Sequence, residues 1–362
     1  MQVRLEPRAE PLRTMQYASP VIALALTAAI GLIILTAIGR DPLAVLYTFT
    51  ISPIRDLYGV GELLLRSAPL ILIALGLAVG FRANIWNIGA EGQLTIGALV
   101  SGGLALHFAD SNSILLLPAM VIVAGLGGMA WAAIPAFLRI RFNANEILVS
   151  LMLTYVAQLW LSYLIYGPWR DPQGFNFPQS QPLGEAALFP ILIEGTRLNA
   201  SVLIVLAAAV AAWVLLGRSF VGFQLRVNGL AGAAARYAGF SGNRAIWIGM
   251  LAGGLAGGLA GVGEVAGPLG QLYPTASPGY GFAAIIVAFL GRLNPIGIVL
   301  AGLLMSLLYL SGEAAQLELD LPSATTGLIQ GMLLFFLLGA DFFIYNRVRV
   351  VGRVSVLKGA AR

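Results

Sequence analysis

The chain contains no cysteine, one histidine (His107) and one lysine (Lys358). Without cysteine it can form neither disulfides nor thiolate metal sites, and it has no cysteine nucleophile. A single histidine excludes an H-E-x-x-H zinc site. Lys358 is followed by glycine and lacks the upstream glycine pattern, so the chain has no phosphate-binding loop of the Walker A type. If ATP hydrolysis drives this protein, another subunit must bind the nucleotide.

Charge is also scarce. Only 10% of the 362 residues are charged and 59% are hydrophobic, and the mean hydropathy is +0.87. A soluble domain is about a quarter charged, so this composition is typical of a membrane protein. The first apolar stretch, 21–38, is longer than the apolar core of a usual signal peptide and no convincing cleavage site follows it. We therefore predict that it is a retained membrane span.

Ten apolar segments are predicted to enter or cross the membrane as helices. They are 20–38, 62–80, 93–108, 114–138, 146–167, 199–217, 245–263, 280–291, 295–312 and 323–343. The chain is long enough for about ten spans of about 20 residues each. We predict an all-α polytopic membrane protein with about ten transmembrane helices and some broken or re-entrant segments, forming a single transmembrane domain over 1–362. Residues 263–281 are predicted to be too broken for a helix and to form a re-entrant or external gating segment.

The basic residues indicate which ends of the helices face the cytoplasm. With the N-terminus inside and alternating spans, 16 of the 21 basic residues fall in cytoplasmic segments, as the positive-inside rule requires. The five outside are Arg40, Arg55, Arg66, Arg170 and Arg197. Both termini are therefore predicted to be cytoplasmic, as an N-terminal tail at 1–18 and a basic tail at 346–362. The longest cytoplasmic segment is 217–244.

A polar run at 81–93 interrupts two apolar segments and is the strongest indication of function. It carries Asn84, Trp86, Asn87, Glu91 and Gln93. Broken helix at membrane depth persists only where it is buried in protein or faces water, and transporters place substrate-binding groups at such breaks. We predict that these five side chains line a substrate path. The alternative is that Glu91 and the amides cap a helix end and that Trp86 is an interfacial anchor.

A second polar stripe follows a predicted helix start at Asn145 and Glu146. Ser150, Thr154 and Gln158 are four residues apart, so they share one face of a helix. Hydroxyl and amide groups on such a face either join helices or line a path. Both interpretations are open, and the three residues are included as candidates for the path. Asn145 is predicted to cap the helix, with Glu146 at its positive end.

Two glycine-containing patterns have simpler explanations than catalysis. Residues 239–242 match the G-x-S-G pattern of a serine nucleophile, but His107 is predicted at the opposite membrane face, too far to act as its base. A helix end with a glycine cap explains the pattern better. Gly253, Gly257 and Gly261 are spaced by four and predict a small-residue face that packs closely against another helix. No catalytic or metal-binding residue is predicted.

Four blocks of the sequence resemble the permease subunits of bacterial ABC importers, in the branch that handles nucleosides and simple sugars. This branch is related to the ribose and branched-chain amino acid permeases. The blocks are 84–93, which is similar to the signature of the family, 145–155, the external loop 167–178 and the cytoplasmic segment 226–239. At position 154 the family is expected to have asparagine, where this chain has threonine. The resemblance covers about 60 to 343.

The resemblance implies an importer made of two permeases, two ATPase domains and an external substrate-binding lipoprotein. The ATPase would bind ATP and magnesium, and this chain would need no cofactor of its own. The second permease is expected to be a different paralogue. The setting would be the bacterial inner membrane, with lipid around the helices and no nucleic acid partner. The residues expected to couple the permease to the ATPase are Arg226, Asn228, Ala234, Arg236 and Tyr237.

We expect a permease that works by alternating access, without a covalent step. Amide groups suit a neutral polar solute better than an ion, and a nucleoside is the first expectation for the substrate. A simple sugar is the alternative. A different class of protein is also open, namely a secondary transporter in which Glu91 or Glu264 carries a coupling proton.

Overall fold

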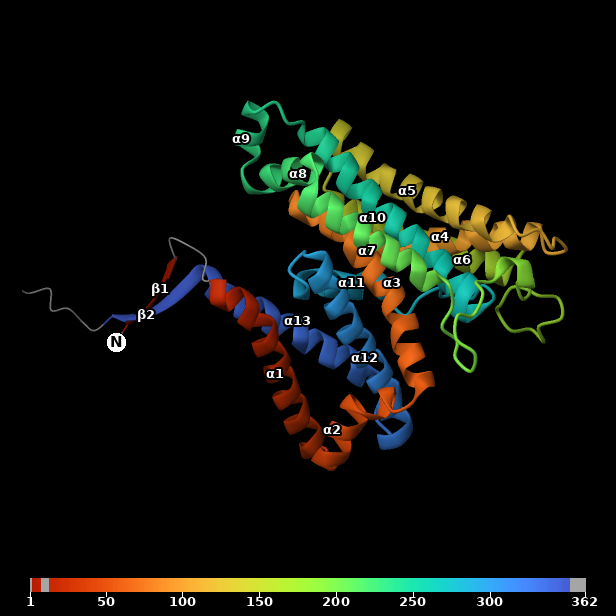
Figure 1. Ribbon diagram of the computed structural model, residues 1–362, viewed down its shortest axis with the longest axis horizontal. Helices are drawn as coiled ribbons and strands as arrows, with labels where there is room; N and C mark the ends of the chain where they lie inside the picture. The colour runs from red at the N-terminus through yellow and green to blue at the C-terminus, as the bar shows by residue number, and fades with distance from the viewer. Residues whose placement is uncertain (1, 8–12, 352–362) are drawn as a thin grey trace, which may run out of the picture. The chain divides into compact units, whose positions relative to one another are not determined.

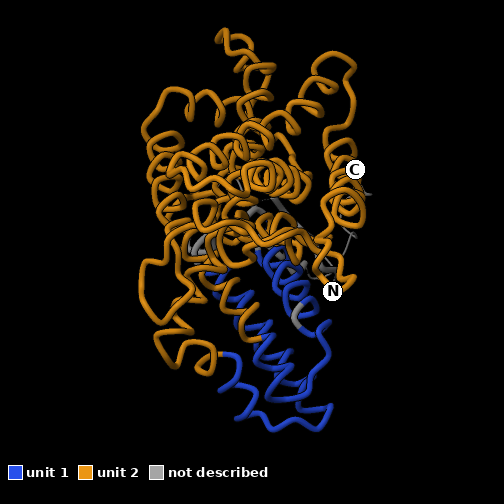
Figure 2. Tube along the Cα trace, turned by 90° about the vertical axis from the view of Figure 1, so that its right-hand side faces the viewer, with its two compact units in different colours: residues 1–49, 312–362 blue, residues 50–311 orange. Residues whose placement is uncertain are grey.

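The computed structural model describes residues 2–7 and 13–351, and the structural statements below concern those residues. The chain forms two compact units (Figure 2). Unit 1 comprises Met1–Phe49 and Gly312–Arg362, and unit 2 comprises Thr50–Ser311. Nearly all of the secondary structure is helical (Figure 1).

Unit 2 contains the polar break and most of the long helices. In chain order its helices are α3 (Leu57–Arg82), α4 (Ala90–His107), α5 (Leu116–Phe142), α6 (Glu146–Tyr166), α7 (Ser201–Arg218), α8 (Phe220–Leu230), α9 (Gly232–Tyr237), α10 (Gly242–Glu264), α11 (Tyr280–Leu290) and the first part of α12 (Pro295–Leu319). Three short helical turns, η1 (Ser52–Ile54), η2 (Glu185–Ala187) and η3 (Val265–Leu269), complete it.

Helix α10 packs against α3, α4 and α5, and its glycines determine how closely these neighbours approach. A Cβ atom added at Gly261 would lie 2.2 Å from the carbonyl oxygen of Leu94 in α4, and one at Gly258 would lie 2.1 Å from that of Ala124 in α5. No side chain fits at such distances, so only glycine permits these contacts. The close-packing face predicted at Gly253, Gly257 and Gly261 is confirmed.

Polar side chains cap the starts of α6 and α10, of which the cap of α6 was predicted. Asn145 Oδ1 accepts a hydrogen bond from the backbone N–H of Ile147 at 2.9 Å, which confirms the predicted cap of α6. The hydroxyl of Ser241 accepts one from the N–H of Arg244 at 3.3 Å and caps α10. Gly239, with φ of +80°, follows the end of α9. The G-x-S-G pattern therefore marks a helix end, as predicted, and also a helix start, which was not predicted.

The prediction that 263–281 is too broken for a helix is wrong for its first part. Helix α10 continues through Glu264, and η3 follows it directly but is kinked at Gly267, whose backbone is not helical (φ −106°, ψ −109°). In an apolar setting, the backbone groups must be bonded within the protein, which favours this continuation despite the glycines. Residues 270–279 contain no helix. They lead into α11, which has 11 residues and is therefore only about 16 Å long.

Unit 1 contains α1 (Arg13–Ala37), most of α2 (Pro42–Thr50), the end of α12 and α13 (Ala324–Tyr345). Its core includes a small buried cluster of Leu35, Val45, Ala315 and Leu321. Two strands, β1 (Gln2–Pro7) and β2 (Asn346–Val351), pair antiparallel. The strands and α2 were not predicted, although apolar and polar residues alternate in 2–6, as they do in a strand.

Each of the ten predicted apolar segments coincides with a helix, with ends that agree to within two residues where the segment extends beyond it. In the described part of the chain, seven helices are long and apolar enough to cross a membrane, and shorter apolar helices accompany them. The chain is therefore an all-α, multi-pass membrane protein, as predicted.

Candidate functional site

The polar break lies deep within unit 2, beside the middle of α10. A Cβ atom added at Gly253 would lie 2.5 Å from Nδ2 of Asn87, and one at Gly257 would lie 3.2 Å from the carbonyl oxygen of Ala90. A helix rises about 1.5 Å per residue, so Gly253 and Gly257 lie roughly 17 and 22 Å along α10 from its first residue, Gly242. Helix α10 has 23 residues. The break therefore interrupts the helical layer well inside the span of α10.

The backbone turns sharply where α3 ends and the break begins. The N–H groups of Ala83 and Ile85 both donate to the carbonyl oxygen of Gly80, at 2.9 and 3.0 Å. Asn84 lies between them in the left-handed conformation, with φ of +57°. Asparagine tolerates this conformation better than most residues. The side chain of Asn84 is exposed, and its Oδ1 accepts a hydrogen bond from Nε1 of Trp86 at 3.0 Å.

Asn87 and Gln93 close the centre of the break by pairing with each other. Nδ2 of Asn87 donates to Oε1 of Gln93 at 2.9 Å, and Nε2 of Gln93 donates to Oδ1 of Asn87 at 3.1 Å. The same Oδ1 accepts the backbone N–H of Gly89 at 3.0 Å. Both side chains are 1% exposed. Their amide groups therefore hold the break in shape in this arrangement of the chain.

Glu91 connects the start of α4 to the start of α11. Its Oε2 accepts the backbone N–H of Gly281 at 2.6 Å, and the side chain is 2% exposed. A Cβ atom at Gly281 would lie 2.2 Å from the backbone nitrogen of Glu91, so the two helix starts are in direct contact. A carboxylate at two helix N-termini is well placed, because the exposed N–H groups there attract negative charge. This bond agrees with the alternative interpretation of Glu91, in which its carboxylate caps a helix end, and the predicted place of Glu91 in a substrate path stays a prediction.

The stripe on α6 packs against the break. The hydroxyl of Ser150 accepts the N–H of Ile88 at 3.2 Å, and that of Thr154 donates to the carbonyl of Ser150 at 3.2 Å. A Cβ atom at Gly92 would lie 2.7 Å from Cα of Thr154. Both side chains are buried, and Gln158 is half-buried. The stripe therefore joins α6 to the break, which is one of its two predicted roles.

An aromatic cluster lies next to the left-handed turn at Asn84. The rings of Trp86 and Phe289 stack with centroids 5.6 Å apart, and those of Phe81 and Phe289 stack at 5.2 Å. Trp86 is half-buried, so it is packed against protein on one side. Stacked aromatic rings contribute about 0.5–1.5 kcal/mol beyond their burial. The cluster fixes α11 against the end of α3.

A cavity of about 570 Å³ opens beside the start of the break. Asn84, Asn228 and Asn243 contribute amides to its lining, and Arg139 and Arg236 contribute guanidinium groups. Arg139 is paired with Glu146 at the start of α6. A cavity of this size is within the range of about 300–1,000 Å³ that is usual for small-molecule sites. It is the largest space near the predicted path residues among the described cavities.

Most of the predicted coupling residues are on the surface. Arg226, Ala234, Arg236 and Tyr237 are exposed, and Tyr237 is 98% exposed. Asn228 is half-buried and donates to the carbonyl of Gln224 at 2.9 Å. Helices α8 and α9 therefore present side chains that a second protein can reach.

Arg82, which ends α3, was not predicted as a site residue. Its Nη1 donates to the carbonyl oxygen of Leu216 in α7, and its Nη2 donates to that of Leu293 before α12, both at 2.8 Å. Its Nε also donates to Leu293, at 3.2 Å. The arginine thus joins three helix ends. Arg82 follows an apolar run, and basic side chains near the end of a helix can bond the last carbonyl groups of helices. This position could have indicated that Arg82 bonds to helix ends.

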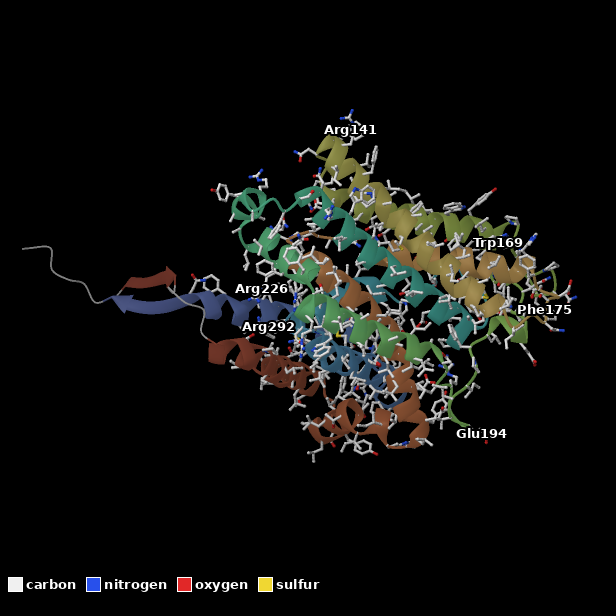
Figure 3. All side chains as sticks on the ribbon, turned by 45° about the horizontal axis from the view of Figure 1, so that its top comes forward. Arg141, Trp169, Phe175, Glu194, Arg226 and Arg292 are labelled. Atoms are coloured by element: carbon white, nitrogen blue, oxygen red, sulfur yellow. The ribbon has the colours of Figure 1, made fainter. Side chains whose placement is uncertain are left out.

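The two ends of unit 2 differ in charge. At the end opposite Arg226 of α8, Nε and Nη2 of Arg197 each donate to Glu62 at 2.8 Å. This bond raises the pKa of Arg197. Arg66 lies 3.8 Å from the same carboxylate. In Figure 3, one end carries Arg141, Arg226 and Arg292, and the opposite end carries Trp169, Phe175 and Glu194.

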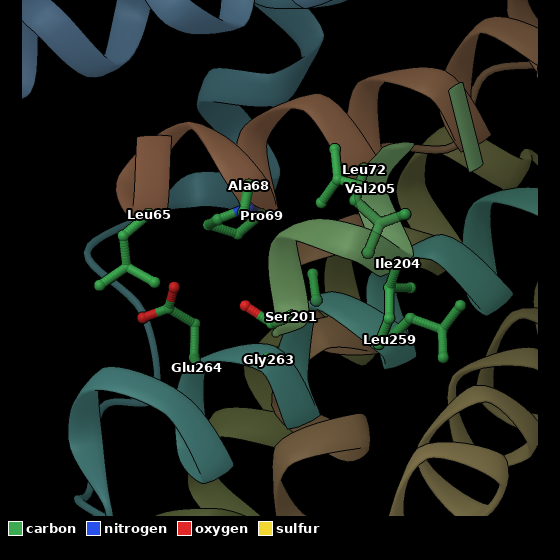
Figure 4. Close-up of a pocket in the computed structure, with 11 residues that line it drawn as sticks. Leu65, Ala68, Pro69, Leu72, Ser201, Ile204, Val205, Leu259, Gly263 and Glu264 are labelled. Carbon is green, nitrogen blue, oxygen red and sulfur yellow. The ribbon is translucent and has the colours of Figure 1, made fainter. Parts of the chain in front are cut away.

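A second cavity, near Glu264, is too small for a solute. Figure 4 shows Glu264 and Ser201 beside it, between α3, α7 and α10. Its volume is about 10 Å³, which is close to the space that one water molecule needs. A transported solute therefore does not fit at Glu264 in this arrangement.

The sequence matches a known family and several of its members. A family model described as the permease component of the branched-chain amino acid transport system matches residues 59–338. The glucose ABC transporter permease protein TsgB13 of Haloferax volcanii is 35% identical over 97% of this chain and 94% of its own. The guanosine ABC transporter permease protein NupP of Bacillus subtilis is 31% identical over 88% of this chain and 91% of its own.

The nucleoside ABC transporter permease protein NupB of Lactococcus lactis is 29% identical over 90% of this chain and 91% of its own. Each of the three organisms has a second ABC permease similar to this chain, at 27 or 28% identity. All of these relatives are transport subunits. This chain therefore belongs to the family of permease components of branched-chain amino acid transport systems, and it is a permease subunit of an ABC transporter.

Proposed function

We propose that this chain moves a nucleoside into the cell by alternating access. The observation that carries the proposal is the cavity of about 570 Å³ at the break, lined by Asn84, Asn228 and Asn243. Each amide offers both donors and an acceptor, as the ring nitrogens, exocyclic groups and ribose hydroxyls of a nucleoside require. Phe240, which also lines the cavity, adds an aromatic ring of the kind on which bases stack.

The path would continue from this cavity into the break. Asn87, Glu91, Gln93, Ser150 and Thr154 are buried in the present arrangement. They reach the substrate only when the helices around the break separate, whereas Asn84, Trp86 and Gln158 are partly or fully accessible now. This division fits a transporter that exposes its path alternately to the two sides of the membrane.

The exposed surface of α8 and α9, at the arginine-rich end of unit 2, suggests where a partner subunit binds. We infer that an ATPase subunit, which binds ATP and magnesium, docks on α8 and α9 through Arg226, Asn228, Ala234, Arg236 and Tyr237. The second permease would be a different paralogue, since each of the three organisms with similar permeases has two. A substrate-binding lipoprotein would deliver the nucleoside at the opposite end. We assign both termini to the cytoplasmic face of a bacterial inner membrane, on the distribution of arginines.

The ATPase activity of the purified complex tests the proposed function. The chain is co-expressed with an ABC ATPase and a second permease of the same organism, and ATP hydrolysis is measured with binding protein loaded with nucleoside, with sugar or with nothing. Stimulation by the nucleoside-loaded protein supports the proposal. Failure of any ATPase to co-purify with the chain would contradict it.

A matched pair of variants tests the cavity. Asn84→Ala should raise the KM for nucleoside about tenfold, because a hydrogen bond contributes about 1 kcal/mol or somewhat more. Asn112→Ala, at an exposed asparagine in the loop between α4 and α5, should leave the KM unchanged. Equal KM values for both variants would remove Asn84 from the site.

A simple sugar is the second candidate substrate. The observation that favours it is the similarity to the glucose permease protein TsgB13, which is 35% identical over 97% of this chain. The amide-lined cavity also suits sugar hydroxyls. Stimulation of ATP hydrolysis by sugar-loaded binding protein alone would keep the importer and change its substrate.

A further inference from the structure

Helix α8 of the coupling segment touches the first peptide of the break. A Cβ atom added at Gly229 would lie 2.1 Å from the carbonyl oxygen of Arg82, 3.0 Å from its carbonyl carbon and 3.2 Å from the carbonyl carbon of Ala83. These are backbone atoms, which cannot rotate away as the end of a side chain can. Position 229 therefore accepts only glycine while this contact is kept.

The side chain of Arg82, next to this peptide, is itself bonded to two other segments. Its bonds to the carbonyl oxygens of Leu216 and Leu293 tie it to the ends of α7 and of the turn after α11. Hydrogen bonds from charged donors are about twice as strong as neutral ones. Arg82 is thus contacted at its backbone by α8 and bonded at its guanidinium to α7 and to the turn before α12.

The next residue along the chain is Asn84, where the backbone enters its left-handed turn and the cavity begins. On the other side of the contact, Asn228 lines the same cavity, and Arg226 is exposed two residues before it. A shift of α8 toward this peptide therefore displaces the backbone that positions Asn84. Packed elements transmit small displacements of about 1–2 Å because they cannot be compressed.

We propose that the contact of Gly229 with the peptide between Arg82 and Ala83 is the link through which the coupling segment moves the break. This inference rests on the proposed docking of an ATPase on α8 and α9. Gly229 and Arg82 are positioning residues in this account, and neither needs to touch the substrate. The contact converts movement of the docked ATPase into opening and closing at Asn84.

A cysteine reporter at Asn84 measures this link, because the chain has no cysteine of its own. Asn84→Cys is labelled with a water-soluble maleimide in the complete complex, with and without ATP and vanadate, and the labelling of this chain is resolved on a gel. We expect trapping of the ATPase to change the labelling rate about 3- to 30-fold, and Gly229→Ala to remove that change. Gly229→Ala should still co-purify with the ATPase, and its uptake should fall by a similar factor.

Gly263→Ala is the matched control, since a Cβ atom there has only an ordinary contact, 3.7 Å from Ser201. It should keep the ATP-dependent change. If Gly229→Ala does not assemble, Arg82→Lys serves instead, since it keeps the charge but cannot reach both carbonyls in the same geometry. The link is overturned if ATP and vanadate still change the labelling rate at Asn84→Cys in these variants. It is also overturned if they do not change the labelling rate of Asn84→Cys in the otherwise unaltered chain. Absence of any ATPase from the parent complex would instead refute the proposed function.

Discussion

The break and the coupling segment are both polar stretches in an apolar chain, but their side chains are used in opposite ways. In the break, Asn87, Glu91 and Gln93 are buried and bonded within the chain. In the coupling segment, Arg236 and Tyr237 are exposed. A polar group that is buried must be bonded or it destabilises the fold, whereas one left in water is available to a partner. Substitutions should therefore affect stability in the break and transport alone in the coupling segment.

The largest effect on stability is expected at Glu91. Glu91→Ala would leave the buried N–H of Gly281 without its acceptor, and we expect a loss of about 3 kcal/mol in the free energy of unfolding. Glu91→Gln keeps an acceptor oxygen and should lose about half as much. Thermal unfolding in detergent measures both. Equal unfolding midpoints for Glu91→Ala and the parent protein would contradict the role of Glu91 as a clasp between α4 and α11.

A smaller loss is expected at the amide pair. Asn87→Ala removes both bonds to Gln93 and the acceptor of the Gly89 N–H, and should cost about 2 kcal/mol. The control is Gln158→Ala on α6, where the side chain is half-buried, and it should change stability by less than about 0.5 kcal/mol. If the two variants unfold alike, the pairing of Asn87 with Gln93 does not hold the break.

The smallest effect on stability, with a large effect on transport, is expected in the coupling segment. Arg236→Glu should unfold within about 0.5 kcal/mol of the parent protein, because the side chain is exposed. It should nevertheless abolish uptake while the binding protein still captures substrate. Arg55→Glu, at an exposed arginine near the start of α3, is the control and should transport normally. Because Arg236 also lines the cavity, co-purification of the ATPase is measured beside uptake, and an Arg236→Glu complex that keeps its ATPase and its uptake would remove Arg236 from the docking surface.

The sequence was sufficient to predict the features that depend on local pattern. The ten apolar segments, the cap at Asn145 and the glycine face of α10 all follow from composition and spacing, and all are confirmed. The position of the break between two apolar runs was equally clear. Such features could be predicted because helix periodicity and backbone pairing in a membrane are local requirements.

The contacts between distant parts of the chain could not be predicted in the same way. Glu91 bonds to Gly281, 190 residues further along the chain, and Arg82 bonds to Leu293, 211 residues away. Each of these residues has many apolar segments as possible neighbours, and the sequence of one chain does not choose among them. The same limit left two roles open for the stripe at Ser150, whose contact with Ile88 comes from packing.

Uptake of labelled nucleoside into proteoliposomes distinguishes an ATP-driven nucleoside importer from an ion-coupled transporter. The complete complex is reconstituted with its binding protein, and uptake is followed with ATP, without ATP, and with ATP plus a protonophore that collapses the membrane potential. We predict uptake that requires ATP and all of the subunits and that persists with the protonophore. Uptake by this chain alone that stops with the protonophore would contradict the account and make it an ion-coupled transporter.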